Sequence, residues 1–167
     1  MTASAEHAPH RTRRWAAPLG LALLLLLALF YVFGAASDLA AVAGHNLPPD
    51  HRGTFATLAG SSFSHTQAAA PGIASYILVL ERGYALHELT FALLFIVILI
   101  FPFRRRQRWA WWAAWLPVIA NLGYTFTFGA HSHAILARSL IADIALPVLL
   151  LAHIPAFFGH RQPRPDC

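Results

Sequence analysis

The chain has 167 residues, of which 57% are hydrophobic and 11% are charged. This composition is too apolar for an ordinary soluble domain of the same length, and it indicates one integral membrane domain over residues 1–167. The net charge of +5 comes from arginines that are divided among several flanks, which excludes a basic nucleic-acid-binding domain. The single cysteine, Cys167, excludes an intramolecular disulfide and a cysteine-based metal cluster.

Four apolar segments have about the 20 residues that are needed to cross the hydrocarbon core of a bilayer. They cover residues 15–36, 75–101, 110–130 and 136–158. We therefore predict an all-α fold, a polytopic membrane four-helix bundle. The first segment also has the basic and small-residue flanks of a secretory signal peptide, and cleavage near Ala36 would leave three helices. Its apolar core is longer than is usual for such a signal, which favours an uncleaved anchor.

The segment between the first two spans, residues 37–72, is predicted to be an external loop. Turn-forming residues at 46–49 and 71–72 bracket it, and Asp50 is a suitable N-cap for one short helix inside it. A connection of this length in a small protein is more often functional than idle.

The second span carries an adjacent pair of ionisable residues, His87 and Glu88. Such side chains cost several kcal/mol inside a bilayer unless they are paired or used. With Glu81, Tyr84 and Phe91, Glu88 follows a spacing of three to four residues, which predicts one stripe of the helix, with His87 beside it. The zinc-protease pattern HExxH is excluded because Phe91 stands where the second histidine would be.

The link between the second and third spans is the short block FPFRRRQRWAWWAAW, residues 101–115. Pro102 is expected to end the second helix, and the arginines and tryptophans are typical of a membrane interface. Basic residues also flank the start of the first span and the end of the fourth: Arg11, Arg13, Arg14, Arg161 and Arg164. By the positive-inside rule, both termini are therefore predicted to be cytoplasmic.

Together with the preceding PGIASYILVLERGYALHEL, this block resembles small uncharacterised bacterial four-helix membrane proteins, loosely the DoxX-like group. The resemblance covers residues 71–120. It implies the four-helix architecture and a multi-pass protein of the bacterial inner membrane, and it carries no catalytic residues across. The long external loop and the histidines depart from the better-known members.

Polar residues of the last two spans are expected to lie at the depth of His87 and Glu88. At about 1.5 Å per residue, Asn121, Tyr124 and Asp143 fall about 18–22 Å from the cytoplasmic boundary, in the outer half of the bilayer. Buried carboxylates are expected to face the bundle interior, so these groups are predicted to form one layer there.

The polar layer predicts acid/base chemistry, isomerase-like or cyclase-like, on a lipid or isoprenoid substrate. The predicted catalytic residues are Glu88, Asp143, His87, Tyr124, Asn121 and Glu81. In this interpretation the partners are membrane lipids and a hydrophobic small molecule. The alternative is a non-catalytic membrane subunit or binding protein in which the same residues form a structural polar network.

A third hypothesis is a metal or haem site on the external side. His131 and His133 are two residues apart, so they would reach one ion if the segment were extended. A loop histidine, His51 or His65, would join them, and Glu81 or Asp50 would supply oxygen. Haem would lie between His87 and either His131 or His133.

Overall fold

The computed structural model describes residues 13–159, and all regular structure in that range is helical. The elements are α1 (Arg13–Ala43), α2 (Pro49–Ala59), α3 (Phe63–Ala69), α4 (Pro71–Ile98), the π-helix η1 (Leu99–Phe103), α5 (Arg108–Ala113), α6 (Leu116–Phe128), the 3-10 helix η2 (Gly129–His131), α7 (His133–Ala152) and α8 (Ile154–Phe158). The all-α prediction is therefore confirmed for this range. Predictions that used Arg11, Arg161, Arg164 or Cys167 concern residues outside it.

Three helical stretches of the described chain are long and apolar enough to cross a membrane: Pro18–Ala43, Pro71–Phe103 and Ile135–Phe158. The third predicted span, 110–130, is instead divided between α5 and α6. Pro117 accounts for the division, because proline has no N–H to bond the carbonyl of Ala113 and its ring crowds that carbonyl. At the beginning of α6 the same proline fits well, since no intrahelical donor is needed there.

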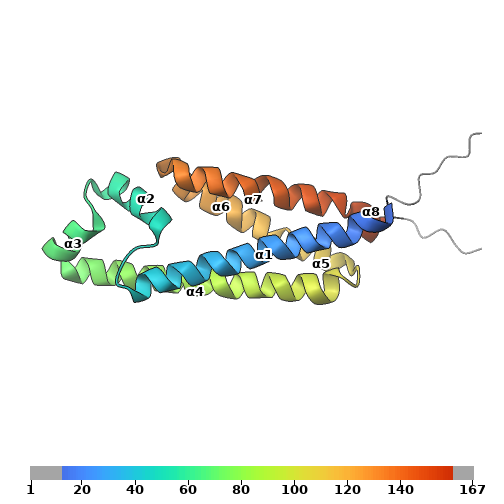
Figure 1. Cartoon of the computed structure of the whole chain (residues 1–167), viewed down its shortest axis with the longest axis horizontal. Helices are drawn as coiled ribbons and strands as arrows, with labels where there is room; N and C mark the ends of the chain where they lie inside the picture. Colours follow the sequence, from blue (N-terminus) through green and yellow to red (C-terminus); the bar gives the residue numbers. More distant parts are fainter. Residues whose placement is uncertain (1–12, 160–167) are drawn as a thin grey trace, which may run out of the picture.

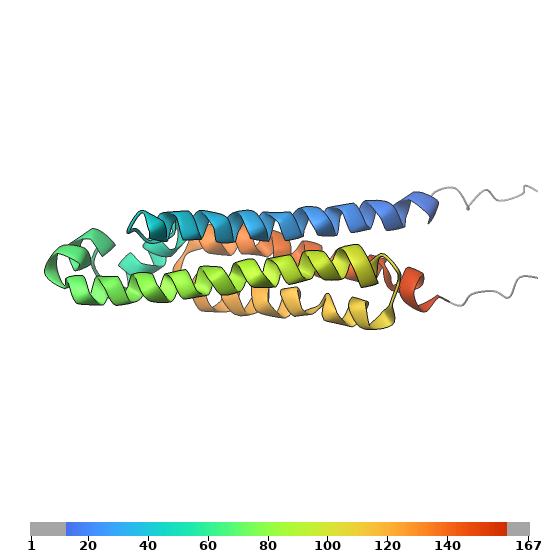
Figure 2. The ribbon, with the colours of Figure 1, turned by 90° about the horizontal axis from the view of Figure 1, so that it is seen from below.

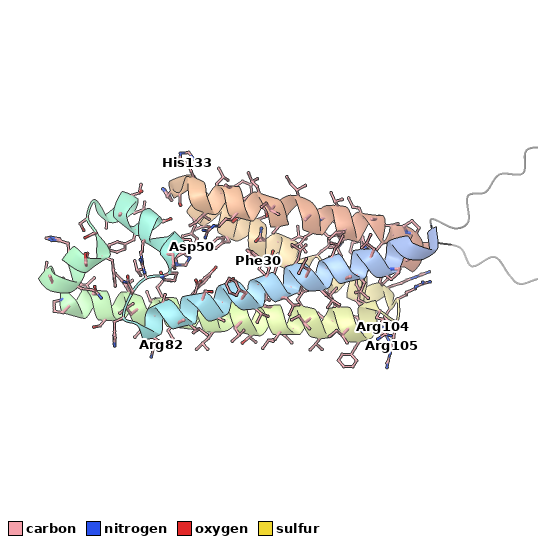
Figure 3. All side chains as sticks on the ribbon, in the orientation of Figure 1. Phe30, Asp50, Arg82, Arg104, Arg105 and His133 are labelled. Carbon is pink, nitrogen blue, oxygen red and sulfur yellow. The ribbon has the colours of Figure 1, made fainter. Side chains whose placement is uncertain are left out.

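The long helices lie side by side (Figures 1 and 2). Along most of its length α1 packs against α4, it also contacts α7, and α6 packs against α7. The short helices α2 and α3 lie together at one end, where α3 contacts the beginning of α4. Arg104 and Arg105 lie at the opposite end, away from Asp50 and His133 (Figure 3). We call these two ends the α2–α3 end and the arginine end.

Several predicted boundaries need correction. The first helix continues to Ala43, so that Asp38 belongs to the helix and not to the loop. The loop contains two helices, and Asp50 is not an N-cap, because Pro48 occupies that position and Asp50 lies in the first turn of α2. The second helix does not end at Pro102, since a π-helical turn continues it to Phe103.

Two separate apolar cores hold the molecule together. The larger core fills the half toward the arginine end and includes Leu24, Ala28, Phe95, Leu99, Trp111, Leu146 and Leu150. The smaller core lies at the α2–α3 end and is built on Leu47, Phe63 and Ala74. Polar side chains come together in the region of the helices that neither core fills, and the candidate site lies there.

Large apolar side chains also cover much of the outer surface. Those that are more than half exposed include Leu26, Leu29, Phe30 and Phe33 on α1, Leu94 on α4, Phe126 on α6 and Ile141 on α7. A soluble monomer rarely exposes so large an apolar surface. Such a surface is typical of helices that face lipid.

Candidate functional site

His51 joins three helices through its imidazole ring. The first turn of α2 holds the side chain in the interior, where it is only 3% exposed. Its Nδ1 lies 2.8 Å from Oε2 of Glu81 on α4, and its Nε2 lies 3.1 Å from the hydroxyl of Tyr124 on α6. On one face the ring stacks on Phe128, with a centroid separation of 5.0 Å and an interplanar angle of 6°.

The surroundings of His51 favour its protonated form. Burial lowers the pKa of His51, but the hydrogen bond to Glu81 and the negative charges of Glu81, Asp50 and Asp38 outweigh burial, so that the pKa is raised above its ordinary value. In the imidazolium, Nδ1–H donates to Glu81 and Nε2–H donates to the oxygen of Tyr124. The Tyr124 hydroxyl, in turn, donates to Oδ2 of Asp50 at 3.3 Å. These contacts form a continuous relay from Glu81 through His51 to Tyr124.

Tyr124 also lines a groove between α4 and α6. The groove has a volume of about 560 Å³, and its walls are Tyr84, His87, Glu88, Thr90, Phe91 and Leu94 of α4 with Ala120, Gly123, Tyr124, Thr127 and Phe128 of α6. On each helix these residues recur every three to four positions and thus share one face. Small residues of α6 open the groove, and a Cβ added at Gly123 would meet no atom within 4 Å.

Glu88 is the carboxylate that lines the groove. Its Oε1 lies 3.7 Å from the place that a Cβ would take at Gly34, so the side chain reaches the surface of α1. Asp38, Asp50 and His51 are the charged groups close enough to act on it electrostatically. Within residues 13–159, the Glu88 carboxylate has no hydrogen-bond partner. It is therefore available to a molecule in the groove.

A second polar network joins α6 to α7 and α1. Asn121 Nδ2 donates to Asp143 Oδ1 at 2.6 Å, and Thr125 Oγ1 donates to Asp143 Oδ2 at 2.8 Å. Asn121 Nδ2 also lies 3.3 Å from the carbonyl oxygen of Ser139, and Tyr31 OH donates to Asn121 Oδ1 at 3.2 Å. Both carboxylate oxygens of Asp143 are thus satisfied from α6. This arrangement is suited to holding helices together.

The residues of the predicted layer take part in two different sets of contacts. Asn121 and Asp143 share the second network, whereas Glu88, Tyr124 and Glu81 belong to the groove and the relay behind it. His87 is exposed at the rim of the groove, where its Nδ1 lies 2.8 Å from the carbonyl oxygen of Gly83, one turn earlier. That these residues share one depth in a membrane stays a prediction.

The predicted external metal site is not assembled. His131 lies in η2 and His133 begins α7, and both side chains are exposed. Among residues 13–159, no three histidine, cysteine or acidic side chains form a group that could hold a metal ion. His51 is hydrogen-bonded to Glu81 and Tyr124 through both ring nitrogens. His87 lines the groove, whereas His131 and His133 do not, so the two ligands predicted for haem do not meet there.

The sequence does not predict three residues of this region in the places that the structure gives them. Asp38 belongs to α1 and not to the loop, and Tyr31 donates a hydrogen bond from an otherwise apolar helix. His51, which the sequence predicts as a loop histidine and possible metal ligand, links α2 to α4 and α6. One signal available in the sequence was the position of Asp50 and His51 beside a helix-starting proline, which favours a helix that buries one of its faces.

Comparisons of this chain with protein-family models, with curated proteins and with solved structures find no match. The resemblance of residues 71–120 to the DoxX-like group thus stays a prediction.

Proposed function

We propose that this chain is a multi-pass protein of the bacterial inner membrane that transfers protons to and from an isoprenoid or sterol-like lipid. The lipid lies in the groove between α4 and α6. The observation that carries the proposal is the relay from Glu81 through His51 to Tyr124, which ends at the groove wall opposite Glu88. An acid and a base thus line one apolar groove, as proton transfer to a lipid requires.

The membrane placement is supported by the distribution of apolar and basic residues. In this proposal α1, α4, α7 and the α5–α6 segment form a four-helix bundle, with exposed Leu and Phe side chains facing lipid. Arg104, Arg105, Arg106 and Arg108 are exposed together at the arginine end, next to Trp109. The positive-inside rule puts this end, and therefore both termini, in the cytoplasm. The α2–α3 end and the opening of the site then face outward.

In the proposed reaction, the hydroxyl of Tyr124 gives its proton to one carbon of a double bond in the lipid. His51 Nε2–H returns a proton to the Tyr124 oxygen, and Glu81 holds the imidazole in place. The Glu88 carboxylate then removes a proton from a neighbouring carbon, so the double bond moves and the lipid keeps its formula. Water at the α2–α3 end carries the proton from Glu88 back to His51, which completes the cycle.

Asp143 and Asn121 have a supporting role in this scheme. Their hydrogen bonds fix α6 against α7, and α6 carries Tyr124 and Phe128. The structural-network alternative thus describes this part of the molecule best.

Deuterium exchange tests the proton transfer without a known product. The purified protein in phospholipid nanodiscs is incubated in D₂O with a panel of prenyl alcohols and sterols. Mass spectrometry of the recovered lipids then measures the deuterium that they have incorporated. Each turnover places one deuterium on carbon. We expect Tyr124→Phe and Glu88→Gln each to slow incorporation about 100-fold, the usual contribution of a general acid or base.

Tyr76→Phe is the matched control, because Tyr76 lies on α4, is 64% exposed and does not line the groove. This variant is expected to exchange at the rate of the unmodified protein. Equal incorporation by the unmodified protein and Tyr124→Phe, or no incorporation into any lipid of the panel, contradicts the proposal.

A further inference from the structure

The acidic residues around the groove outnumber its basic ones. Glu88 lines the groove, and Asp38, Asp50 and Glu81 come from the neighbouring parts of α1, α2 and α4. Two imidazoles lie among them: His51, whose ion-pair partner is Glu81, and His87, which lines the groove and lies with its Nδ1 2.8 Å from the carbonyl oxygen of Gly83. When His51 is protonated, its pair with Glu81 is neutral, and the carboxyl groups of Asp38, Asp50 and Glu88 remain outside that ion pair.

The arginines at this end of the chain do not balance these acids. The guanidinium of Arg52 donates from Nε to the carbonyl oxygen of Leu47, and its side chain is exposed. Arg82 and Arg138 are exposed as well. In the described part of the chain, the ion pair of His51 with Glu81 is the one that forms. The region therefore favours a positively charged molecule over an anionic one.

Aromatic rings stand next to Glu88 in the groove wall. Tyr84 and Tyr124 are stacked with a centroid separation of 6.3 Å and an interplanar angle of 18°, and the rings of Tyr124 and Phe128 are 5.0 Å apart. Aromatic faces attract cations, and the attraction is stronger where water is excluded. Aromatic rings beside a carboxylate are a usual arrangement for holding an ammonium group.

We infer that the groove is a binding site for amphiphiles that carry a positive charge, such as long-chain ammonium compounds. The ammonium group lies against Glu88 and the rings of Tyr84 and Tyr124, and the chain extends along Phe91 and Leu94. The volume of about 560 Å³ is in the range of small-molecule sites. Anionic phospholipids and prenyl diphosphates are excluded by the same charges.

This inference rests on the groove of the proposed function, but it does not depend on proton transfer. It states that the site recognises a positive charge. In the proposed reaction, a positive charge develops on the lipid when its double bond is protonated. A stable ammonium compound should imitate that charged species and bind more tightly than a neutral lipid of the same length.

Binding of tetradecyltrimethylammonium tests the inference, with tetradecanol as the neutral probe of equal chain length. Titration calorimetry is carried out on the protein in phosphatidylcholine nanodiscs, and the heat from empty nanodiscs is subtracted. We expect saturable binding of one ammonium probe per protein, at least about tenfold tighter than binding of tetradecanol. Glu88→Gln should weaken the ammonium probe about tenfold and leave tetradecanol unchanged.

Two glycine substitutions show whether binding occurs in the groove. Gly123 lines the groove and Gly83 does not, and a Cβ added at either position meets no atom within 4 Å. A Cβ therefore fits at both positions, and binding is measured on Gly123→Phe and Gly83→Phe that elute as folded protein in size-exclusion chromatography. Gly123→Phe should abolish binding of the ammonium probe, whereas Gly83→Phe should preserve it.

Equal affinities for the two probes, an unchanged affinity in Glu88→Gln or full binding by Gly123→Phe overturns the inference. The two proposals fail separately. If deuterium is incorporated but the ammonium probe is not preferred, the inference of charge recognition is contradicted and the proposed reaction is not. If the ammonium probe binds but no deuterium is incorporated, the proposed reaction is contradicted and the protein is a binding protein.

Discussion

His51 is the residue that links the three helices at the α2–α3 end of the site. It comes from α2 and binds one residue of α4 and one of α6, positions that are 30 and 73 residues away in the chain. No local spacing in the sequence predicts contacts between residues so far apart. The sequence indicated a functional loop and an acidic stripe, whereas the pairing of the loop with Glu81 follows only from how α2 folds back onto α4 and α6.

The raised pKa of His51 makes stability depend on pH. Because the protonated form is favoured in the folded state, its contribution is fully present below the pKa of the unfolded chain, near 6.5, and is lost as the pH rises through the folded pKa. We expect His51→Gln to lower the free energy of unfolding by about 2 kcal/mol at pH 6, the usual value for a buried hydrogen bond to a charged group. The difference should shrink as the pH increases.

Thermal unfolding in detergent between pH 5.5 and 8.5 measures this difference. The groups that face His51 are Asp38 from α1, Asp50 from α2, Glu81 from α4 and Tyr124 from α6. These groups are present in both proteins, so the difference between the two curves reports the loss of the histidine. If the difference in Tm between the unmodified protein and His51→Gln stays constant or widens as the pH rises, the raised pKa of His51 is contradicted.

At the scale of the elements, periodicity predicted the lining of the groove better than the ends of the helices. Tyr84, Glu88 and Phe91 were placed on one stripe by spacing alone, and all three line the groove. Their partner face on α6 was less evident, because a helix that is apolar almost all round does not reveal which side meets α4. The break before α6 was missed although Pro117 is visible in the sequence, since the total apolar length from 110 to 130 suggested one span.

The contact of α1 with α7 depends on a glycine at the arginine end. A Cβ added at Gly20 would overlap the ring of His153, the residue that caps the end of α7. That ring is 5% exposed, its Nδ1 lies 2.7 Å from the carbonyl oxygen of Leu149, and Phe103 meets it edge-on, so it has little room to move. The close approach of α1 therefore requires glycine at this position.

We expect Gly20→Ala to destabilise the protein by about 1–3 kcal/mol, the usual cost of inserting an atom into a packed core. Thermal unfolding in detergent would detect the loss as a lower Tm. The control is Gly83→Ala, which adds the same methyl group to α4 in open space and should be neutral or slightly stabilising. If both variants unfold at the same temperature as the unmodified protein, the packing at Gly20 is not as tight as described.

For the whole molecule, composition was sufficient to predict an all-helical membrane protein, because apolar helices satisfy their own backbone and expose side chains that suit lipid. Orientation is a separate prediction that depends on charge. The exposed arginines between η1 and α5 favour a cytoplasmic arginine end, and the polar α2 and α3 favour an external position for the other end.

Cysteine labelling in intact cells tests the orientation. Ser64 on α3 and Gln107 beside the arginines are both exposed, and Cys167 is the natural cysteine of the chain. With Cys167 replaced by serine, Ser64→Cys should react with a membrane-impermeant maleimide in intact cells. Gln107→Cys in the same background, and Cys167 in the unmodified chain, should react only after the cells are opened. Labelling of Gln107→Cys in intact cells would show that the topology is the reverse of the proposed one.

The large apolar core toward the arginine end has a consequence for the proposed proton transfer. Between Asp143 and that end, the helices meet through side chains such as Leu24, Ala28, Leu99 and Leu146, which hold neither water nor protons. A proton that reaches His51 from the α2–α3 end would therefore return to the α2–α3 end, because this apolar core separates the site from the arginine end. In the proposed orientation, the acid/base state of the site would therefore follow the pH of the external compartment and not the pH of the cytoplasm.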